Sequence, residues 1–101
     1  GTIFTTGDNV YETGTPQEFA ECYAPTWGRH LARTRPAPGN HDWGTDTLAG
    51  YLGYFGAAAT GPDGASWYSY DLASWHVVVL DSSCDRVGGC GPGAGRHVRL
   101  K

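Results

Sequence analysis

The sequence predicts an α/β fold in which a strand, a helix, an extended segment, a second helix and a β-hairpin follow one another along 101 residues. Three observations predict it. A β-branched and aromatic run at residues 2–6 ends at Gly-Asp. A capping-box pattern begins at Thr15. Two strand-like segments, residues 66–72 and 75–81, are joined by only Ala73-Ser74. Open α/β sheets of this kind bind ligands beyond the carboxyl ends of their strands.

The first helix has clear start and stop signals. Thr15 is the candidate N-cap, Pro16 takes the first helical position, and Glu18 follows three residues after the cap. Pro25 ends the helix. Its apolar positions have helical spacing: Phe19, Cys22 and Tyr23.

The middle of the chain reads as an extended segment and a weak helix. Pro36 and Pro38 keep residues 33–42 extended. Residues 46–56 predict a helix that its glycines weaken, and residues 60–65 predict a turn. The helix has one apolar face: Leu48, Tyr51, Leu52 and Phe55.

The two hairpin strands differ in pattern. Residues 66–72 alternate, whereas residues 75–81 are nearly continuously apolar, which is typical of a strand buried on both faces. We expect the aromatic residues of this region to pack in a core: Trp67, Tyr68, Tyr70 and Trp75. The expected domain covers residues 1–90, and residues 91–101 form an irregular tail.

Composition excludes two classes of partner. A net charge of −3 argues against nucleic acid, and no apolar run approaches the roughly 20 residues that span a bilayer. The chain has no Met and begins directly in a predicted strand, so we expect a piece of a longer protein. Cys84 and Cys90, close together in CDRVGGC, predict a local disulfide and an oxidising compartment, with two free thiols as the alternative. Cys22 is left over, either buried in the helix or paired outside these residues.

Two loops carry the polar residues that bear chemistry: GDNVY at residues 7–11 and GNHD at residues 39–42. Each follows a predicted strand. Their carboxylate, phenol and amide oxygens are hard ligands, suited to Fe, Mn, Mg or Zn. Loops at neighbouring strand ends could hold two metal ions with one bridging carboxylate, an arrangement that activates water for attack on phosphorus.

Gly-Asp-x-x-Tyr, followed about 30 residues later by Gly-Asn-His-Asp, resembles the calcineurin-like metallophosphoesterases. The tyrosine points to their purple acid phosphatase branch, and the resemblance extends over residues 2–83. It implies a two-sheet α/β sandwich, of which this chain is the N-terminal half. It also implies a phosphomonoesterase with two metal ions, Fe with Zn, Mn or Fe, in which hydroxide attacks phosphorus.

The resemblance implies a role for each matching residue. Asp8 corresponds to the carboxylate that bridges the metals, Tyr11 to the phenolate on Fe(III), and Asn40 to an amide ligand of the second metal. His41 corresponds to the histidine that contacts phosphate and protonates the leaving group. Asp42 would hydrogen-bond and orient His41.

The chain also departs from the family pattern. An earlier Asp motif and two later His motifs are absent, and His97, in GRHVRL, does not match the second of these. We therefore expect the chain alone to be inactive, and its parent to be a secreted or periplasmic enzyme acting on small phosphomonoesters. Two alternatives stay open: a phosphodiesterase or nuclease on the same scaffold, and a non-enzymatic extracellular binding module rich in aromatic residues.

Each site residue also has a plainer interpretation. Asp8 and Asp42 could cap turns, Tyr11 could be packing, and Trp43 could be either a pocket wall or a core residue. We expect the other polar candidates to be structural or solvated rather than functional: His30, His76, Arg29, Arg33 and Arg35.

Overall fold

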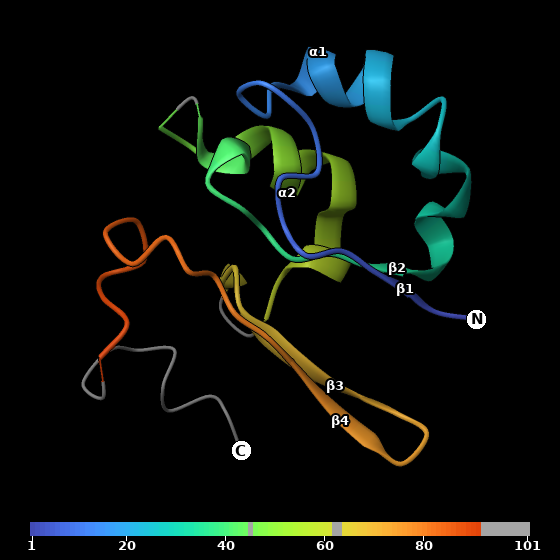
Figure 1. Cartoon of the computed structure of the whole chain (residues 1–101), viewed down its shortest axis with the longest axis vertical. Helices are drawn as coiled ribbons and strands as arrows, with labels where there is room; N and C mark the ends of the chain where they lie inside the picture. The colour runs from blue at the N-terminus through green and yellow to red at the C-terminus, as the bar shows by residue number, and fades with distance from the viewer. Residues whose placement is uncertain (45, 62–63, 92–101) are drawn as a thin grey trace.

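A short parallel pair of strands runs through the middle of the chain, with the helices on one side and a β-hairpin on the other (Figure 1). In this computed structural model, which describes residues 1–44, 46–61 and 64–91, β1 (Ile3–Phe4) pairs with β2 (Thr34–Arg35). The predicted strand at residues 2–6 is shorter, because beyond Phe4 the Ala37 N–H donates to Thr5 Oγ1 at 3.0 Å rather than to a backbone carbonyl of β1. The chain is thus a small mixed α/β domain with two small sheets among the described residues.

The first helix begins and ends as predicted. α1 (Pro16–Glu18) continues into a π-helix, η1 (Phe19–Tyr23), and stops before Pro25. The predicted capping box is present: Thr15 Oγ1 accepts from the Glu18 N–H at 3.1 Å, and Glu18 Oε1 accepts from the Thr15 N–H at 3.1 Å. Glu18 also accepts from the backbone N–H groups of Glu12 and Thr13, so it organises the loop before the helix.

Glu18 should give the fold an acid-sensitive element. The backbone N–H of Thr15, the largest cause, and those of Glu12 and Thr13 lower the pKa of Glu18 from its ordinary 4.5 to about 2. Because the folded pKa lies below the unfolded one, this contribution to stability is present above about pH 4.5 and is lost as pH falls toward 2.

We expect Glu18→Gln, which retains an N3 acceptor but cannot titrate, to flatten the fall of the urea midpoint between pH 4.5 and 2. Glu21→Gln removes an exposed carboxylate from the same helical segment and controls for the change in charge. An unchanged acid profile in Glu18→Gln would contradict this role.

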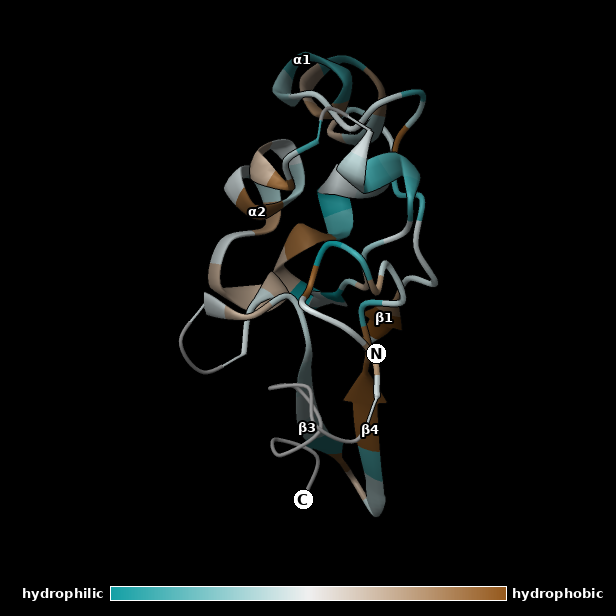
Figure 2. Cartoon of the chain, turned by 90° about the vertical axis from the view of Figure 1, so that its left-hand side faces the viewer, coloured by the Kyte–Doolittle hydropathy of each residue, from teal (hydrophilic) through white to brown (hydrophobic). Residues whose placement is uncertain are grey.

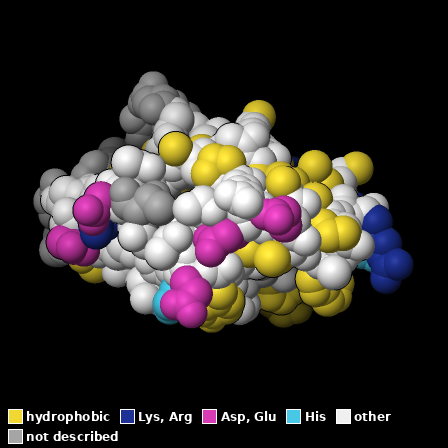
Figure 3. Space-filling view, turned by 90° about the horizontal axis from the view of Figure 1, so that it is seen from above, with side chains coloured by type: hydrophobic (Ala, Val, Ile, Leu, Met, Phe, Trp, Pro, Cys, Tyr) yellow, Lys and Arg dark blue, Asp and Glu magenta, His cyan; other side chains and the backbone are white. Residues whose placement is uncertain are grey.

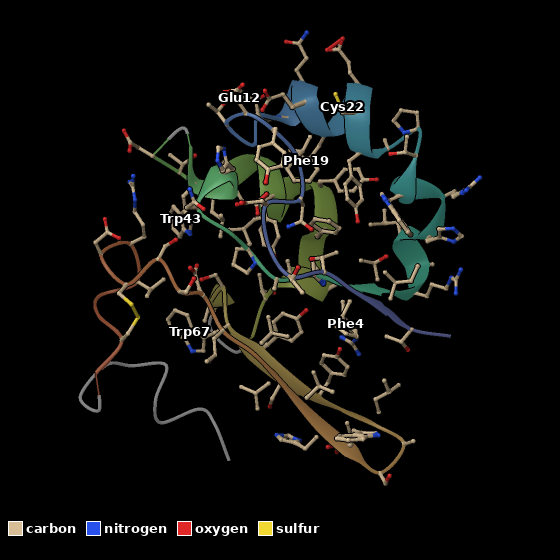
Figure 4. The ribbon with its side chains drawn as sticks, in the orientation of Figure 1. Phe4, Glu12, Phe19, Cys22, Trp43 and Trp67 are labelled. Atoms are coloured by element: carbon tan, nitrogen blue, oxygen red, sulfur yellow. A yellow bond between two sulfur atoms is a disulfide. The ribbon has the colours of Figure 1, made fainter. Side chains whose placement is uncertain are left out.

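The core is aromatic and lies between the two helical segments. α2 (Ala49–Phe55) continues into a 3₁₀ turn, η4 (Gly56–Ala59). Three of the four residues predicted for its apolar face are buried, namely Leu48, Tyr51 and Phe55, and Leu52 is partly buried. Phe19 stacks on Tyr54 and meets the edge of Phe55, between α1 and α2 (Figure 4).

One helical segment was not predicted. η2 (Trp27–Arg33) is a 3₁₀ helix broken by non-helical backbone angles at His30. Short 3₁₀ segments lack the 3.6-residue apolar period by which a helix is recognised. The segment places Arg29 and Arg33 on an exposed surface, as expected, and Arg33 donates to His30 Nδ1 at 2.9 Å.

The hairpin forms as predicted, but its burial was predicted wrongly. β3 (Tyr68–Leu72) pairs antiparallel with β4 (Trp75–Val79). Val79 is buried, whereas Trp75 is 73% exposed and Val78 is 42% exposed. The hairpin extends away from the helices, so Trp75 and Val78 face solvent rather than a second layer (Figures 1 and 2). The prediction that these aromatic residues pack in a core is therefore confirmed for Tyr68 and wrong for Trp75.

The cysteines pair as predicted. Cys84 and Cys90 form a disulfide. Cys22 is a free thiol and is exposed on η1 (Figure 4), so the first of its two alternatives, burial in the helix, does not hold. Residues 62–63 of the predicted turn and residues 92–101 of the predicted tail, with His97, lie outside the described residues. None of the described helices is long and apolar enough to cross a membrane.

Candidate functional site

The two polar loops meet because they leave neighbouring parallel strands at the same end. The loop after β1 carries Asp8 and Tyr11. The loop after β2 carries His41 and Asp42 in a short 3₁₀ turn, η3 (His41–Trp43). The backbone N–H of His41 donates to Asp8 Oδ1 at 3.0 Å across 33 residues of sequence. This hydrogen bond joins the two predicted motifs directly.

Close backbone contact between the loops depends on glycine. A Cβ on Gly39 would collide with the backbone nitrogen and Oδ1 of Asp8. Gly7, at φ +102°, approaches so closely that its Cβ would lie 3.0 Å from the Cα of Gly39. Asp8 itself has φ 50°, a left-handed conformation that is uncommon for a non-glycine residue. The glycines of both motifs therefore allow the contact, and the Asp8 side chain fills the space beside Gly39.

Tyr11 and Asp8 form the most compact polar pair of the site. Tyr11 Oη donates to Asp8 Oδ2 at 3.1 Å, and Tyr11 as a residue is 56% exposed. The hydrogen bond to Asp8 is the main cause that raises the pKa of Tyr11 above its ordinary value. Without a cation the phenol therefore stays protonated. A bound metal ion would reverse that preference, because its charge favours the phenolate.

The His41 ring is oriented by a partner that the sequence did not indicate. Its Nδ1 lies 2.7 Å from the carbonyl oxygen of Glu12, and its ring centroid lies 4.5 Å from that of Tyr11. A carbonyl accepts only, so Nδ1 carries a proton, and in neutral His41 the acceptor nitrogen is Nε2. The expected hydrogen bond from the His41 ring to the Asp42 carboxylate was wrong, because His41 Nδ1 donates to the Glu12 carbonyl instead.

Asp42 instead joins the two loops through hydrogen bonds to its buried carboxylate. Its side chain is fully buried, and its carboxylate accepts from the Gly39 N–H at 2.8 Å, the Asn9 N–H at 3.3 Å and Asn9 Nδ2 at 3.1 Å. Burial raises the pKa of Asp42, while the Gly39 and Asn9 donors oppose that rise. These donors lie three residues before Asp42 and in the other loop, so the contacts differ from the alternative interpretation, in which Asp42 caps the turn that follows it.

Asn40 is the predicted ligand that the structure does not gather with the others. It is exposed immediately before η3. Its carbonyl oxygen accepts from the Trp43 N–H at 3.1 Å. In the described part of the chain, no hydrogen bond joins its side chain to Asp8 or Tyr11. The backbone places Asn40 beside the site, and its expected role as a ligand stays a prediction.

Two polar residues beyond the predicted set hold the site in place. Asn9 Nδ2 donates to Asp42 and to the Ala37 carbonyl at 2.9 Å, so Asn9 bridges the two loops. Asp81, fully buried after β4, accepts from Ser66 Oγ at 2.6 Å and from Trp43 Nε1 at 3.1 Å. A polar residue at the end of an apolar strand was the sequence signal for Asp81. Trp43 therefore anchors η3 to the hairpin.

The oxygen atoms of Asp8 and Tyr11 are of the kind that part of a metal site would need. In octahedral coordination, two neighbouring oxygen ligands each lie about 2.1 Å from the ion, and their bonds to it form a right angle. The two oxygens then lie about 3 Å from each other. The Asp8 Oδ2 and Tyr11 Oη atoms lie 3.1 Å apart, joined by a hydrogen bond that a bound cation would replace. A carboxylate and a phenol also suit a hard cation. Within residues 1–44, 46–61 and 64–91, no three His, Cys, Asp or Glu side chains gather to hold an ion, so Asp8 and Tyr11 would be a partial ligand set.

The fold and the site together define a class: a small mixed α/β domain with a polar site where two parallel strands end. No protein-family model matches the chain. Neither the curated proteins nor the solved structures include a match.

Proposed function

We propose that this chain contributes the Asp8–Tyr11 and Asn40–Asp42 loops of a metal-dependent hydrolase of phosphoric monoesters. The observation that carries the proposal is the hydrogen bond from the His41 N–H to Asp8 Oδ1 at 3.0 Å. It brings a predicted proton donor and a predicted metal ligand, far apart in sequence, into one site. The contact supports grouping the two motifs in one function.

Each side chain has a specific task in this proposal. Asp8 and Tyr11 bind a cation through adjacent oxygens, and Asn40 supplies a neutral oxygen beside them. Metal ions bound there supply Lewis-acid stabilisation of charge on the phosphoryl group and activation of water. His41 moves the proton: the Glu12 carbonyl holds Nδ1–H, which leaves Nε2 to donate to the departing oxygen when the ring carries a second proton. Asp42 fixes the loop that carries His41.

The metal test uses the product of the complete open reading frame that encodes this chain. We expect Fe(III) to give a visible phenolate absorption band, Tyr11→Phe to abolish the band, and Asp8→Asn to abolish most iron binding. Tyr54→Phe, which alters a partly buried tyrosine that stacks on Phe19 in the core, is the matched control and should keep the band. Full iron binding by Asp8→Asn would contradict the assignment.

His41 is tested by activity rather than by metal content. We expect His41→Ala to lower kcat for an aryl phosphomonoester by about 10²-fold or more with bound metal unchanged. The Tyr54→Phe variant again serves as the control. A higher rate on a phosphodiester than on the monoester would favour the diesterase alternative. Glycan binding without metal dependence would favour the binding module.

An extracytoplasmic location is part of the proposal. The Cys84–Cys90 disulfide supports it, because disulfides persist in oxidising compartments.

A further inference from the structure

The turn that carries His41 lies against a loop that a disulfide closes. This disulfide loop, residues 84–90, is joined at its first and last residues, and Figure 4 shows the bond on the same side of the molecule as Trp43. Arg86 of the loop donates from Nη2 to Asp46 Oδ1 at 2.7 Å, and its guanidinium carbon lies 5.8 Å from the centroid of the Trp43 ring. Figure 3 shows basic and acidic side chains together at this left-hand end of the molecule. The disulfide loop thus reaches the His41 turn through Arg86.

Arg86 holds two parts of that turn. Trp43 is the last residue of η3, and the Asp46 N–H donates to the Trp43 carbonyl at 3.0 Å. Asp46 has φ 62°, a left-handed conformation that is uncommon for a non-glycine residue, and the ion pair with Arg86 helps to hold it. An exposed ion pair and a cation–π contact each add a modest stabilisation. The order of the turn therefore depends in part on where the disulfide loop holds Arg86.

The position of Arg86 depends in turn on the disulfide. Gly88 and Gly89 have positive φ, 81° and 110°, and the Gly89 N–H donates to the Cys84 carbonyl at 2.8 Å. Glycine has many other conformations when a loop is open, and a disulfide removes most of them. Cys90 is exposed and Cys84 is half-buried, so external thiols and disulfides can reach the bond.

We propose that the Cys84–Cys90 pair is a redox switch of η3, in which the disulfide holds Arg86 against this turn and the two free thiols release it. One cysteine thiolate attacks an external disulfide, and the second attacks the mixed disulfide that results. The external S–S bond breaks, the protein S–S bond forms, and the external partner leaves as two thiols with the two electrons and two protons. An external dithiol reverses the exchange. The switch itself does not depend on the proposed function, whereas its effect on proton transfer by His41 rests on that proposal.

Hydrogen exchange, measured by NMR on the whole 101-residue chain, tests the switch. The probe is the Trp43 Nε1–H, which donates to Asp81 Oδ2 at 3.1 Å and is protected while the turn is closed. We expect reduction with dithiothreitol to speed its exchange about threefold to tenfold, since one exposed ion pair and one cation–π contact are lost together. The Glu18 N–H, in the capping box, is the internal reference and should exchange at an unchanged rate.

Two variants separate this path from a general effect of the bond. Arg86→Gln in the oxidised chain should speed Trp43 exchange about as much as reduction does, and reduction should then add little. In Cys84→Ser/Cys90→Ser, the exchange should be fast both with and without dithiothreitol. Arg29→Gln, which removes an exposed arginine of η2, is the matched control and should behave as wild type.

Three results would overturn the proposal. Equal Trp43 exchange in the oxidised and reduced chains would show that the bond does not hold the turn. An equal response to reduction in Arg86→Gln and in wild type would show that the effect does not pass through Arg86. Loss of the folded circular dichroism spectrum on reduction would show that the disulfide supports the whole fold rather than one turn.

Discussion

Replacement of Asp42 by alanine is expected to cause one of the largest losses of stability in this chain. The carboxylate is fully buried and accepts from Gly39 and from two donors of Asn9. Alanine leaves these donors without their acceptor, and each buried unsatisfied donor costs about 1–3 kcal/mol. We expect a total loss of about 3 kcal/mol or more, a large part of the roughly 5–15 kcal/mol that holds a typical domain folded.

Urea unfolding, followed by circular dichroism, measures this loss. Asp42→Asn keeps one acceptor oxygen and should fall between wild type and alanine. Asp85→Ala removes an exposed carboxylate, 3.9 Å from Arg86, and should shift the midpoint little. If Asp42→Ala unfolded at the wild-type urea concentration, Asp42 would not join the loops. Because the readout is stability, the result is independent of catalysis.

Two glycines of the same helix should respond to alanine in opposite directions. Gly50 is buried in α2, and a Cβ there would run into the carbonyl oxygen of Gly14 and lie 3.0 Å from the carbonyl carbon of Thr15. Both are backbone atoms, so the helix must move away from the capped loop. We expect Gly50→Ala to destabilise the fold by about 1–3 kcal/mol, as overpacking does.

Gly53 is the matched control. It is exposed, and a Cβ there would meet nothing within 4 Å. Alanine should therefore stabilise the helix, by up to about 1 kcal/mol. Thermal unfolding of the two variants gives the comparison. A gain in stability for Gly50→Ala would show that α2 does not pack closely on the Gly14 loop.

The residues of the site were easier to predict than their contacts. Asp8, Tyr11 and His41 were singled out as residue types in a spaced pattern, and the structure brings them together because β1 and β2 are parallel. The partner of His41 was predicted wrongly, since the Glu12 carbonyl holds the ring. A carbonyl belongs to every residue, so no sequence pattern can mark the one that accepts.

Burial of the hairpin shows a similar limit. The apolar run of β4 predicted a strand, and a strand forms. Whether its faces are covered depends on what lies above and below it. In the structure Trp75 and Val78 face solvent because the hairpin extends beyond the helices. A run of apolar residues in a sequence indicates that the segment can be buried. It does not indicate which other part of the protein covers it.

The sequence by itself determined the local features: the capping box at Thr15 and Glu18, the two-residue hairpin connection, and the Cys84–Cys90 disulfide. These depend on residues close together along the chain, where sequence distance nearly equals spatial distance. Only the tertiary structure decided that Asp42 of one loop accepts from Asn9 of the other, and that the Glu12 carbonyl accepts from the His41 ring. Both depend on residues about 30 positions apart, whose contact is set by the path of the backbone between them.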